Sequence, residues 1–327
     1  MTIDIEHAPQ RVLVTGATGF VGSALVSALN KQSGCLPVSV VRSKAATPVG
    51  NSQSFCIPDI SSSTEWRDCL KGVAVIVHAA ARVHVMKEVA VDALSEFRKI
   101  NVEGTVNLAR QAAQAGVKRF VFISSIKVNG EETHPGRPFT ADDNPAPSDP
   151  YGISKQEAEE ALLALSQETG MEVVIVRPTL IYGPGVKANF RSMMGWLKKG
   201  IPLPFGAIYN KRSLVSLENL ISLILVCLTH PNAAGQIFLV SDGVDLSTTE
   251  LLSRTAEALG VKSRLIPVPV RLLVFCAVAL GRRALSQRLC GSLQVDISKT
   301  QTLLGWNPPV SVQDALNRTA KEFLECR

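Results

Sequence analysis

A glycine-rich turn near the start of the chain is the feature that most constrains the fold. Residues 11–14 form a short apolar run that predicts a strand, and residues 23–29 predict a helix. Between them, residues 15–22 read Thr-Gly-Ala-Thr-Gly-Phe-Val-Gly. Gly16 and Gly19 permit a tight turn and a close approach of the backbone to a pyrophosphate, and a helix N-terminus attracts phosphates. The segment therefore predicts a dinucleotide-binding β-α unit.

Apolar strands alternate with helical segments through the first half of the chain. After the first strand we expect strands at residues 37–41, 55–57, 73–77, 118–123 and 171–176. A long helix is expected at residues 97–115, ending at Gly116. This alternation predicts an α/β fold built on a doubly wound parallel sheet of the Rossmann type.

The alternation weakens after residue 179, which suggests a second domain. We predict that residues 1–179 form the NAD(P)-binding domain, to which a strand near residues 236–240 returns. Residues 180–327 are expected to form mainly a smaller C-terminal substrate-binding domain. The run from Glu131 to Pro150 contains five prolines and predicts an active-site flap, because long structureless loops inside domains are usually functional.

The net charge of +6 is concentrated in two stretches of the second half. Residues 173–217 and 262–295 contain lysines and arginines but no aspartate or glutamate. Such local basic stretches suit a small anionic ligand, for example a diphosphate. The chain has three tyrosines and three tryptophans and no recognisable nucleic-acid module, so we expect no nucleic-acid partner.

Cysteine usage and hydropathy predict a soluble, cytoplasmic protein. The seven cysteines are scattered singly, which is typical of reduced thiols, and the first ten residues do not predict a signal peptide. The longest strongly apolar run, Leu272–Leu280, is too short to span a bilayer. We predict that it is a buried helix because it is apolar all round. The alternative is a weak peripheral contact with an acidic membrane surface, since arginines flank the run.

A candidate proton-transfer pair stands after the proline-rich run. Tyr151 and Lys155 form a Tyr-x-x-x-Lys pattern at the start of a predicted helix, with Pro150 just before it. Residues four apart share one face of a helix, and a nearby ammonium favours the phenolate and lowers the pKa of a tyrosine. The pair therefore suits proton transfer near neutral pH. The alternative is a solvated pair on a surface helix.

The ends of the predicted strands supply further candidates. Arg42 follows the second strand, where a basic residue accommodates the 2′-phosphate of NADP, unless it is simply a solvated residue there. Asp59 follows the third strand and can accept a hydrogen bond from an adenine amino group, or belongs to a turn. The small residues Ala79, Ala80 and Ala81 let a cofactor lie against the backbone. We expect His78 to be a packed or hydrogen-bonded histidine.

Together these motifs resemble those of the extended short-chain dehydrogenase/reductase superfamily. The resemblance covers the chain from Arg11 to the Leu-Gly-Trp-x-Pro that begins at Leu304. The motifs that carry it are Thr-Gly-x-x-Gly-x-x-Gly at 15–22, His-Ala-Ala-Ala at 78–81, Asn-Val-x-Gly-Thr at 101–105, Ser-Ser at 124–125, Tyr-x-x-x-Lys at 151–155 and Arg-Pro-x-x-x-Tyr-Gly-Pro at 177–184.

The resemblance implies a role for each catalytic residue. Ser125 hydrogen-bonds the reacting oxygen, Tyr151 passes the proton, and Lys155 holds the nicotinamide ribose while a hydride moves between nicotinamide and substrate. NADP is the preferred cofactor because of Arg42, with NAD possible, and no metal site is expected. The expected cofactor-binding residues are Gly16, Thr18, Gly19, Phe20, Val21, Arg42, Asp59, Ile60, Ala79, Ala80, Ala81, Asn101, Tyr151, Lys155 and Pro178.

The resemblance also points to a UDP-sugar substrate. Asn189, Lys211 and Arg212 resemble positions by which sugar-nucleotide enzymes hold the substrate, with Arg212 against the diphosphate and Arg288 as a looser second candidate. Lys127 is expected near the substrate, or else is a solvated lysine. Relatives form dimers through the helices near residues 97–115 and 151–166, so we expect a homodimer.

Departures from the family pattern narrow the reaction. Nucleotide-sugar dehydratases carry Asp-Glu where this chain has Ile126 and Lys127, so dehydration lacks its acid/base pair. Residues 125–131 resemble UDP-4-keto-6-deoxy-N-acetylhexosamine 4-reductases, which make UDP-N-acetylquinovosamine for lipopolysaccharide and O-antigen. Our first hypothesis is this NADP-dependent reduction at C4. The alternatives are an NAD-dependent 4-epimerase of a UDP-hexose or UDP-N-acetylhexosamine, a reductase of a lipophilic ketone, and a non-catalytic NADP-binding regulator.

Overall fold

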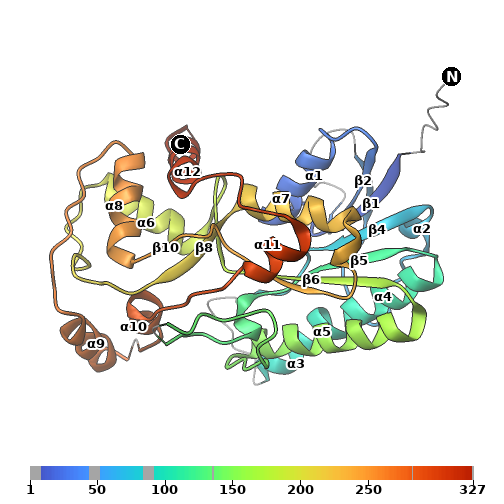
Figure 1. The fold of residues 1–327 in the computed structure, drawn as a ribbon, viewed down its shortest axis with the longest axis horizontal. Helices are drawn as coiled ribbons and strands as arrows, with labels where there is room; N and C mark the ends of the chain where they lie inside the picture. The colour runs from blue at the N-terminus through green and yellow to red at the C-terminus, as the bar shows by residue number, and fades with distance from the viewer. Residues whose placement is uncertain (1–8, 44–51, 84–91, 135, 282, 326–327) are drawn as a thin grey trace. The chain divides into compact units, whose positions relative to one another are not determined.

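The computed structural model describes residues 9–43, 52–83, 92–134, 136–281 and 283–325 (Figure 1). Contacts among them divide the chain into two compact units. Unit 1 comprises Met1–Gly130, Asn144–Arg177 and Leu223–Phe238, and unit 2 comprises Glu131–Asp143, Pro178–Ser222 and Leu239–Arg327. One border falls at 177/178, close to the predicted border at 179/180, but each unit also takes segments from the other half of the sequence.

Unit 1 is built on a seven-stranded sheet in the order β3-β2-β1-β4-β5-β6-β9. Neighbouring strands from β3 to β6 run parallel, which confirms the predicted doubly wound fold. The strand order reverses between β1 and β4, where open α/β sheets bind ligands at the carboxyl ends of the strands. The strands are β1 (Gln10–Thr15), β2 (Cys35–Val41), β3 (Gln53–Cys56), β4 (Val73–His78), β5 (Arg119–Ile123), β6 (Glu172–Pro178) and β9 (Ile237–Val240).

Helices cover both faces of this sheet, with α1 on one face and α4 and α5 on the other (Figure 1). The predicted helix 97–115 is not continuous, because Lys99–Gly104 form a wider π-helical turn. Such turns are frequent at functional sites. The helices are α1 (Phe20–Leu29), α2 (Arg67–Leu70), α3 (Ala93–Arg98), η1 (Lys99–Gly104), α4 (Thr105–Gln114), η2 (Ile126–Val128), α5 (Pro150–Thr169), α7 (Leu217–Thr229), which both units share, and η3 (Pro231–Ala233).

Helix α5 begins and ends at residues that favour those positions. The Asp149 carboxylate caps its start by accepting a hydrogen bond from the Gly152 N–H at 2.7 Å, and Pro150 occupies the first turn. Gly170 ends the helix in the left-handed conformation at φ 73°. The predicted helix start at Pro150 is confirmed.

A buried ion pair joins α5 to two strands of unit 1. Arg177, at the end of β6, donates from Nε to Glu159 on α5 at 3.0 Å and from Nη1 to Asn129 at 2.9 Å. The Ser124 hydroxyl, just after β5, also donates to the Glu159 carboxylate. Glu159 and Arg177 are each 2% exposed. The network therefore satisfies two buried charges and fixes α5 against the end of β5, next to Ser125.

Unit 2 contains a small sheet in the order β10-β8-β7. β7 (Leu180–Tyr182) runs parallel to β8 (Arg212–Ser216), and β10 (Asp245–Leu246) runs antiparallel to it. The sequence did not predict this sheet, because its strands are too short to carry a pattern. The helices are α6 (Ala188–Lys198), α8 (Thr248–Ala258), α9 (Val270–Ala279), α10 (Arg283–Cys290), α11 (Ser298–Leu304) and α12 (Val312–Glu325).

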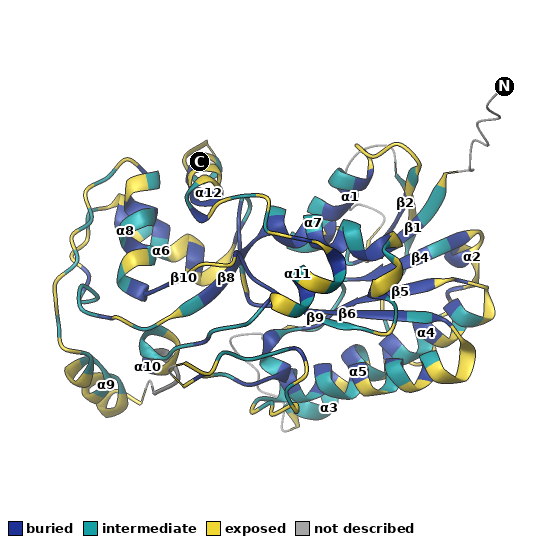
Figure 2. Ribbon diagram, in the orientation of Figure 1, coloured by how far each residue is buried: buried dark blue, intermediate teal, exposed yellow. Residues whose placement is uncertain are grey.

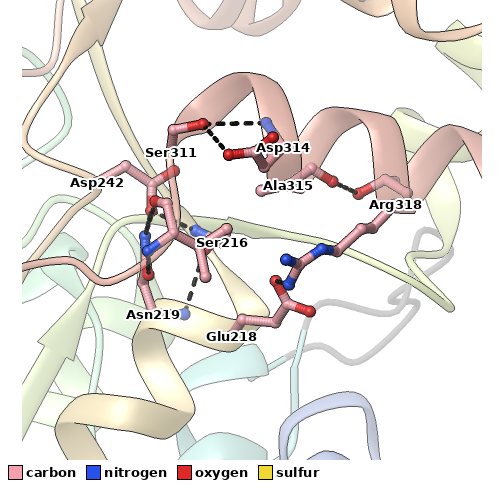
Figure 3. Close-up of polar contacts among 10 residues, drawn as sticks. Ser216, Glu218, Asn219, Asp242, Ser311, Asp314, Ala315 and Arg318 are labelled. Carbon is pink, nitrogen blue, oxygen red and sulfur yellow. Dashed lines mark hydrogen bonds and ion pairs between the residues drawn. The ribbon is translucent and has the colours of Figure 1, made fainter.

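A buried carboxylate, Asp242, organises the interior of unit 2. It accepts hydrogen bonds from the Ser216 N–H at 2.8 Å and the Asn219 amide at 2.7 Å (Figure 3), and from the Tyr182 hydroxyl at 2.8 Å. Burial raises the pKa of Asp242. Asn219 also exchanges hydrogen bonds with the backbone of Val310. Tyr182, the tyrosine of the Arg-Pro-x-x-x-Tyr-Gly-Pro motif, is therefore part of the packing of unit 2.

The proline-rich run predicted as a flap is divided between the units. Residues 131–143 belong to unit 2, where the Thr133 N–H donates to the Ser292 carbonyl at 2.8 Å and the Phe139 N–H donates to the Gln294 carbonyl at 2.9 Å. The remainder of the run leads into α5 within unit 1. Residues 131–143 are therefore hydrogen-bonded to residues 292–294, which belong to the same unit.

Helix α9 contradicts the prediction of a buried helix at Leu272–Leu280. None of its residues is buried, and Figure 2 shows it as mostly exposed. The sequence argument failed because a run that is apolar all round has the same pattern whether it is buried or lies at the surface. In the described part of the chain, no helix is long and apolar enough to cross a membrane.

The buried ion pair of α5 makes a prediction about stability. Glu159→Gln leaves the Arg177 guanidinium buried without a counter-charge, so we expect the free energy of unfolding to fall by about 3–5 kcal/mol in urea titrations. The matched control is Glu160→Gln at the next position, an exposed residue that accepts a hydrogen bond from Gln156. It should change the free energy by less than about 0.5 kcal/mol. Equal effects of the two variants would contradict the prediction.

Candidate active site

A pocket of about 240 Å³ lies at the carboxyl ends of the central strands of unit 1. It gathers eight of the expected cofactor-binding residues, namely Gly16, Thr18, Gly19, Arg42, Ile60, Ala79, Ala80 and Ala81. Val40, Val41 and Ile57 also line it. Sequence reasoning missed these three because they are ordinary apolar strand residues, and their places at strand ends were the only available signal.

The glycine-rich turn leaves room that any larger residue would fill. Gly16 has φ 66°, and a Cβ atom added to it would lie 2.9 Å from the Ala80 nitrogen. A Cβ on Gly22 would lie 2.1 Å from the Gly16 carbonyl oxygen. The bare backbone at the start of α1 therefore forms a cradle that fits the pyrophosphate of a dinucleotide. Phe20 and Val21 form the first turn of α1 beside it.

A hydrogen-bonded chain ties the two strands that flank the pocket. The His78 ring, 1% exposed, lies 2.8 Å from the Thr15 hydroxyl through Nδ1 and 3.0 Å from the Thr105 hydroxyl through Nε2. The Ala80 N–H donates to the same Thr15 hydroxyl at 3.2 Å. Burial, with a smaller effect of Lys155, lowers the pKa of His78 to about 3, so the ring is neutral. His78 is the hydrogen-bonded, packed histidine that the sequence predicted.

Arg42 and Asp59 lie at the rim of the site. Arg42 is exposed and lines the pocket directly after β2. Asp59 is exposed and lines a neighbouring hollow, which Ile60 shares. The Asp59 carbonyl accepts a hydrogen bond from the Thr64 hydroxyl at 3.0 Å, so its backbone forms a turn. Its contact with an adenine stays a prediction.

The three expected catalytic residues come from two adjacent elements of unit 1. Tyr151 and Lys155 share one face of α5, and Ser125 follows β5 and caps the short helix η2. The Ser125 hydroxyl accepts from the Lys127 N–H at 3.3 Å. Its neighbour Ser124 donates to Glu159 instead.

Lys155 is a buried cation with few partners. It is 2% exposed, its Nζ donates to the Ile123 carbonyl at 2.8 Å, and the same atom lies 4.3 Å from the centre of the Phe122 ring. Burial lowers the pKa of Lys155 to about 7, although Glu159 opposes the shift. The side chain therefore changes charge near neutral pH.

The pKa of Tyr151 is shifted in the direction opposite to the one predicted from the sequence. Burial of the phenol and the nearby Asp149 carboxylate raise its pKa above the ordinary value, whereas the pattern predicted a lowering by Lys155. Burial is the larger cause and the charge of Asp149 the smaller one, while the Lys155 ammonium bonds to the Ile123 carbonyl. In the protein alone, Tyr151 is therefore a protonated phenol at neutral pH.

Asn101 and Lys127 both make contacts within unit 1. The Asn101 amide, on the π-helical turn, donates to the Arg82 carbonyl at 3.1 Å and to the Ser154 hydroxyl at 3.0 Å, and Ser154 in turn donates to the Tyr151 carbonyl at 2.8 Å. Asn101 thus positions the first turn of α5. Lys127 forms an ion pair with Asp149 and is not simply solvated. Cofactor and substrate contacts of these two residues stay predictions.

The remaining substrate candidates and Pro178 belong to unit 2. Arg212 is half-buried, donates to the Gly291 carbonyl at 3.1 Å, and has a lowered pKa because of burial and the positive charge of Arg288. The charge of Glu132 opposes this shift and acts on Arg212 more strongly than the charge of Arg288 does. Asn189 is exposed in the first turn of α6, directly after Ala188, whose φ of 52° is unusual for a residue with a side chain.

The buried ammonium of Lys155 predicts how stability depends on pH. The folded protein releases this proton at about pH 7, whereas the unfolded chain keeps it to about 10.5, so the free energy of unfolding should rise with pH between these values. Lys155→Met removes the effect. The difference in slope should approach about 1.4 kcal/mol per pH unit in urea titrations from pH 7 to 9.5. Lys321→Met, at an exposed lysine of α12, controls for the loss of charge; equal slopes in wild type and Lys155→Met would contradict the prediction.

Comparisons with known proteins agree with this geometry. Residues 12–241 match the model of the NAD dependent epimerase/dehydratase family. The chain is 50% identical over 318 residues to a UDP-glucose 4-epimerase of Vibrio cholerae, and the match covers 97% of this chain and 96% of the relative.

Solved structures show the same fold. MoeE5 in complex with UDP-glucose and NAD gives a TM-score of 0.77 at 26% identity, covering 97% of this chain and 99% of MoeE5. RMD from Pseudomonas aeruginosa, complexed with NADPH, gives a TM-score of 0.72 at 22% identity, covering 96% of this chain and 99% of RMD. Structural neighbours thus bind NAD or NADPH. The match over most of its length shows that this chain belongs to the NAD dependent epimerase/dehydratase family.

Proposed function

We propose that the protein is an NAD-dependent 4-epimerase of a UDP-hexose or UDP-N-acetylhexosamine. The observation that carries this proposal is the 50% identity, over nearly the whole chain, to a UDP-glucose 4-epimerase. The complete set of Ser125, Tyr151 and Lys155 in unit 1 supports it. The MoeE5 neighbour, which holds UDP-glucose and NAD, is consistent with it.

Three residues of this chain would have separate roles in the 4-epimerisation. A dinucleotide held in the glycine-lined pocket would supply a nicotinamide as acceptor and donor of the hydride. Tyr151 takes the proton of the C4 hydroxyl as that carbon is oxidised, and gives a proton back when the 4-keto sugar is reduced on its other face. Ser125 donates a hydrogen bond to the C4 oxygen. Lys155 would hold the nicotinamide ribose, the role that the family resemblance gives it.

The reductase hypothesis has less support than the epimerase. A net reductase and a 4-epimerase use the same three residues, and the protonated Tyr151 suits the reductive step of either. The 50% identity to a UDP-glucose 4-epimerase favours the epimerase, and with it NAD as the cofactor. Arg42 at the pocket rim is the residue that favours NADP. Membership of this enzyme family supports catalysis over the regulatory alternative.

We also propose that the enzyme acts in the cytoplasm as a homodimer. The proposed contact uses α4 and α5, which pack together along one face of the unit 1 sheet. The expectation comes from the family resemblance. Sedimentation equilibrium at several protein concentrations measures the mass of the assembly directly.

The epimerase proposal predicts turnover without added cofactor. Purified protein incubated with UDP-glucose or UDP-N-acetylglucosamine should form the corresponding galacto sugar, and mass spectrometry of the denatured protein should release NAD. Tyr151→Phe should retain the dinucleotide while the rate falls by about 10²–10⁴-fold, since proton transfer is lost. Absence of interconversion, together with NADPH oxidation on addition of a UDP-4-keto-6-deoxy-N-acetylhexosamine, would establish the reductase instead.

The half-buried Arg212 of unit 2 leads to a prediction about substrate affinity. Arg212→Met removes a charge-assisted contact to the diphosphate, so KM for the UDP-sugar should rise about 10–100-fold while kcat changes less. The matched control is Lys199→Met, at an exposed basic residue of unit 2. Steady-state kinetics separate the two parameters. A fall in kcat alone would place Arg212 outside the diphosphate site.

A further inference from the structure

Helix α9 presents an apolar face to solvent. Leu272, Phe275 and Val278 are 51%, 70% and 52% exposed, and Leu280 just after the helix is 75% exposed. Residues 272, 275, 276 and 279 follow the spacing of a single helix face, and all four are exposed. The half-buried residues 273, 274 and 277 form the opposite face. The outward face of α9 is therefore a continuous apolar stripe.

This orientation is the reverse of an ordinary surface helix. Surface helices of globular proteins turn their apolar stripe to the core and their charged residues to water. In α9, Arg271 is the charged residue, and it lies beside the exposed stripe. Contiguous exposed apolar surface of this kind marks a site of interaction with a partner.

The charges around α9 indicate the chemistry of that partner. Residues 262–295 contain six basic residues and no acidic residue. Lys262, Arg264 and Arg271 are exposed; Arg282 lies outside the described residues, and nothing is described of the Arg283 side chain. An apolar stripe with Arg271 beside it, in a stretch of sequence without acidic residues, matches an anionic lipid surface, which offers hydrocarbon below and phosphate above. A second copy of the chain fits poorly, because residues 262–295 offer no acidic residue to pair with Arg271.

We propose that α9 is an interfacial helix that docks the protein on an anionic lipid bilayer. The apolar stripe enters the boundary between headgroups and acyl chains, and Arg271 contacts lipid phosphates. The helix lies in the plane of the interface and does not span it. The proposal is independent of the reaction catalysed in unit 1.

The test measures binding to lipid vesicles by flotation. The full chain should float with vesicles that contain phosphatidylglycerol and stay in the lower fraction with phosphatidylcholine alone. Binding should weaken at about 0.5 M salt, which screens the arginines. In a Phe275→Trp variant, the new fluorophore should shift to shorter wavelength with anionic vesicles and be quenched by brominated acyl chains.

Matched variants identify the surface that binds. Leu272→Ser combined with Phe275→Ser should lower the partition coefficient more than about tenfold, and Arg271→Gln about fivefold. Leu36→Ser, at a residue of unit 1 that is 47% exposed, is the control for loss of an exposed leucine and should bind like wild type. Circular dichroism checks that each variant is folded.

Two outcomes would overturn the proposal. One is that wild-type protein fails to float with anionic vesicles. The other is self-association that the Leu272→Ser/Phe275→Ser variant abolishes in analytical ultracentrifugation, without vesicle binding, because α9 would then be covered by a second copy.

Discussion

The buried face of α5 is the constraint on which the catalytic part of unit 1 depends. Charges removed from water are costly unless they are paired, so each charged group on this face must find a partner. Lys155 bonds to the Ile123 carbonyl of β5, and Glu159 bonds to Arg177 at the end of β6. Because these partners lie on adjacent strands, the pairing sets the rotation of α5 against the sheet. That rotation in turn sets the direction in which Tyr151 is presented.

Local electrostatics could not be predicted from residue spacing. A spacing of four places Tyr151 and Lys155 on one helix face, but it does not determine where the long lysine side chain ends. In the structure the ammonium is held by the Ile123 carbonyl and the Phe122 ring, and burial, with a smaller effect of the Asp149 carboxylate, raises the pKa of the phenol. The cap that starts α5 and the catalytic residue that follows it are thus electrostatically coupled, and no sequence pattern records this.

The sequence predicted the structure best where a physical requirement restricts the type of residue that can stand at a position. Gly16 and Gly19 mark a close backbone approach, and alternating apolar runs mark the strands of unit 1, so the sheet and the glycine-lined pocket were predictable. The small sheet of unit 2 was not, because strands such as Asp245–Leu246 are too short for periodicity. Nor was the exposure of α9, since composition alone does not distinguish core from interface.

The interleaving of the two units has a consequence for synthesis on the ribosome. The chain passes back and forth between them, and the last strand of the large sheet, β9, is supplied by Ile237–Val240. Until those residues emerge, β6 remains an open edge with unpaired backbone groups, a template for association with other chains. The nascent protein therefore cannot complete its first unit before two of the three segments of the second, residues 131–143 and 178–222, have been translated. Neither unit corresponds to a contiguous stretch of the gene.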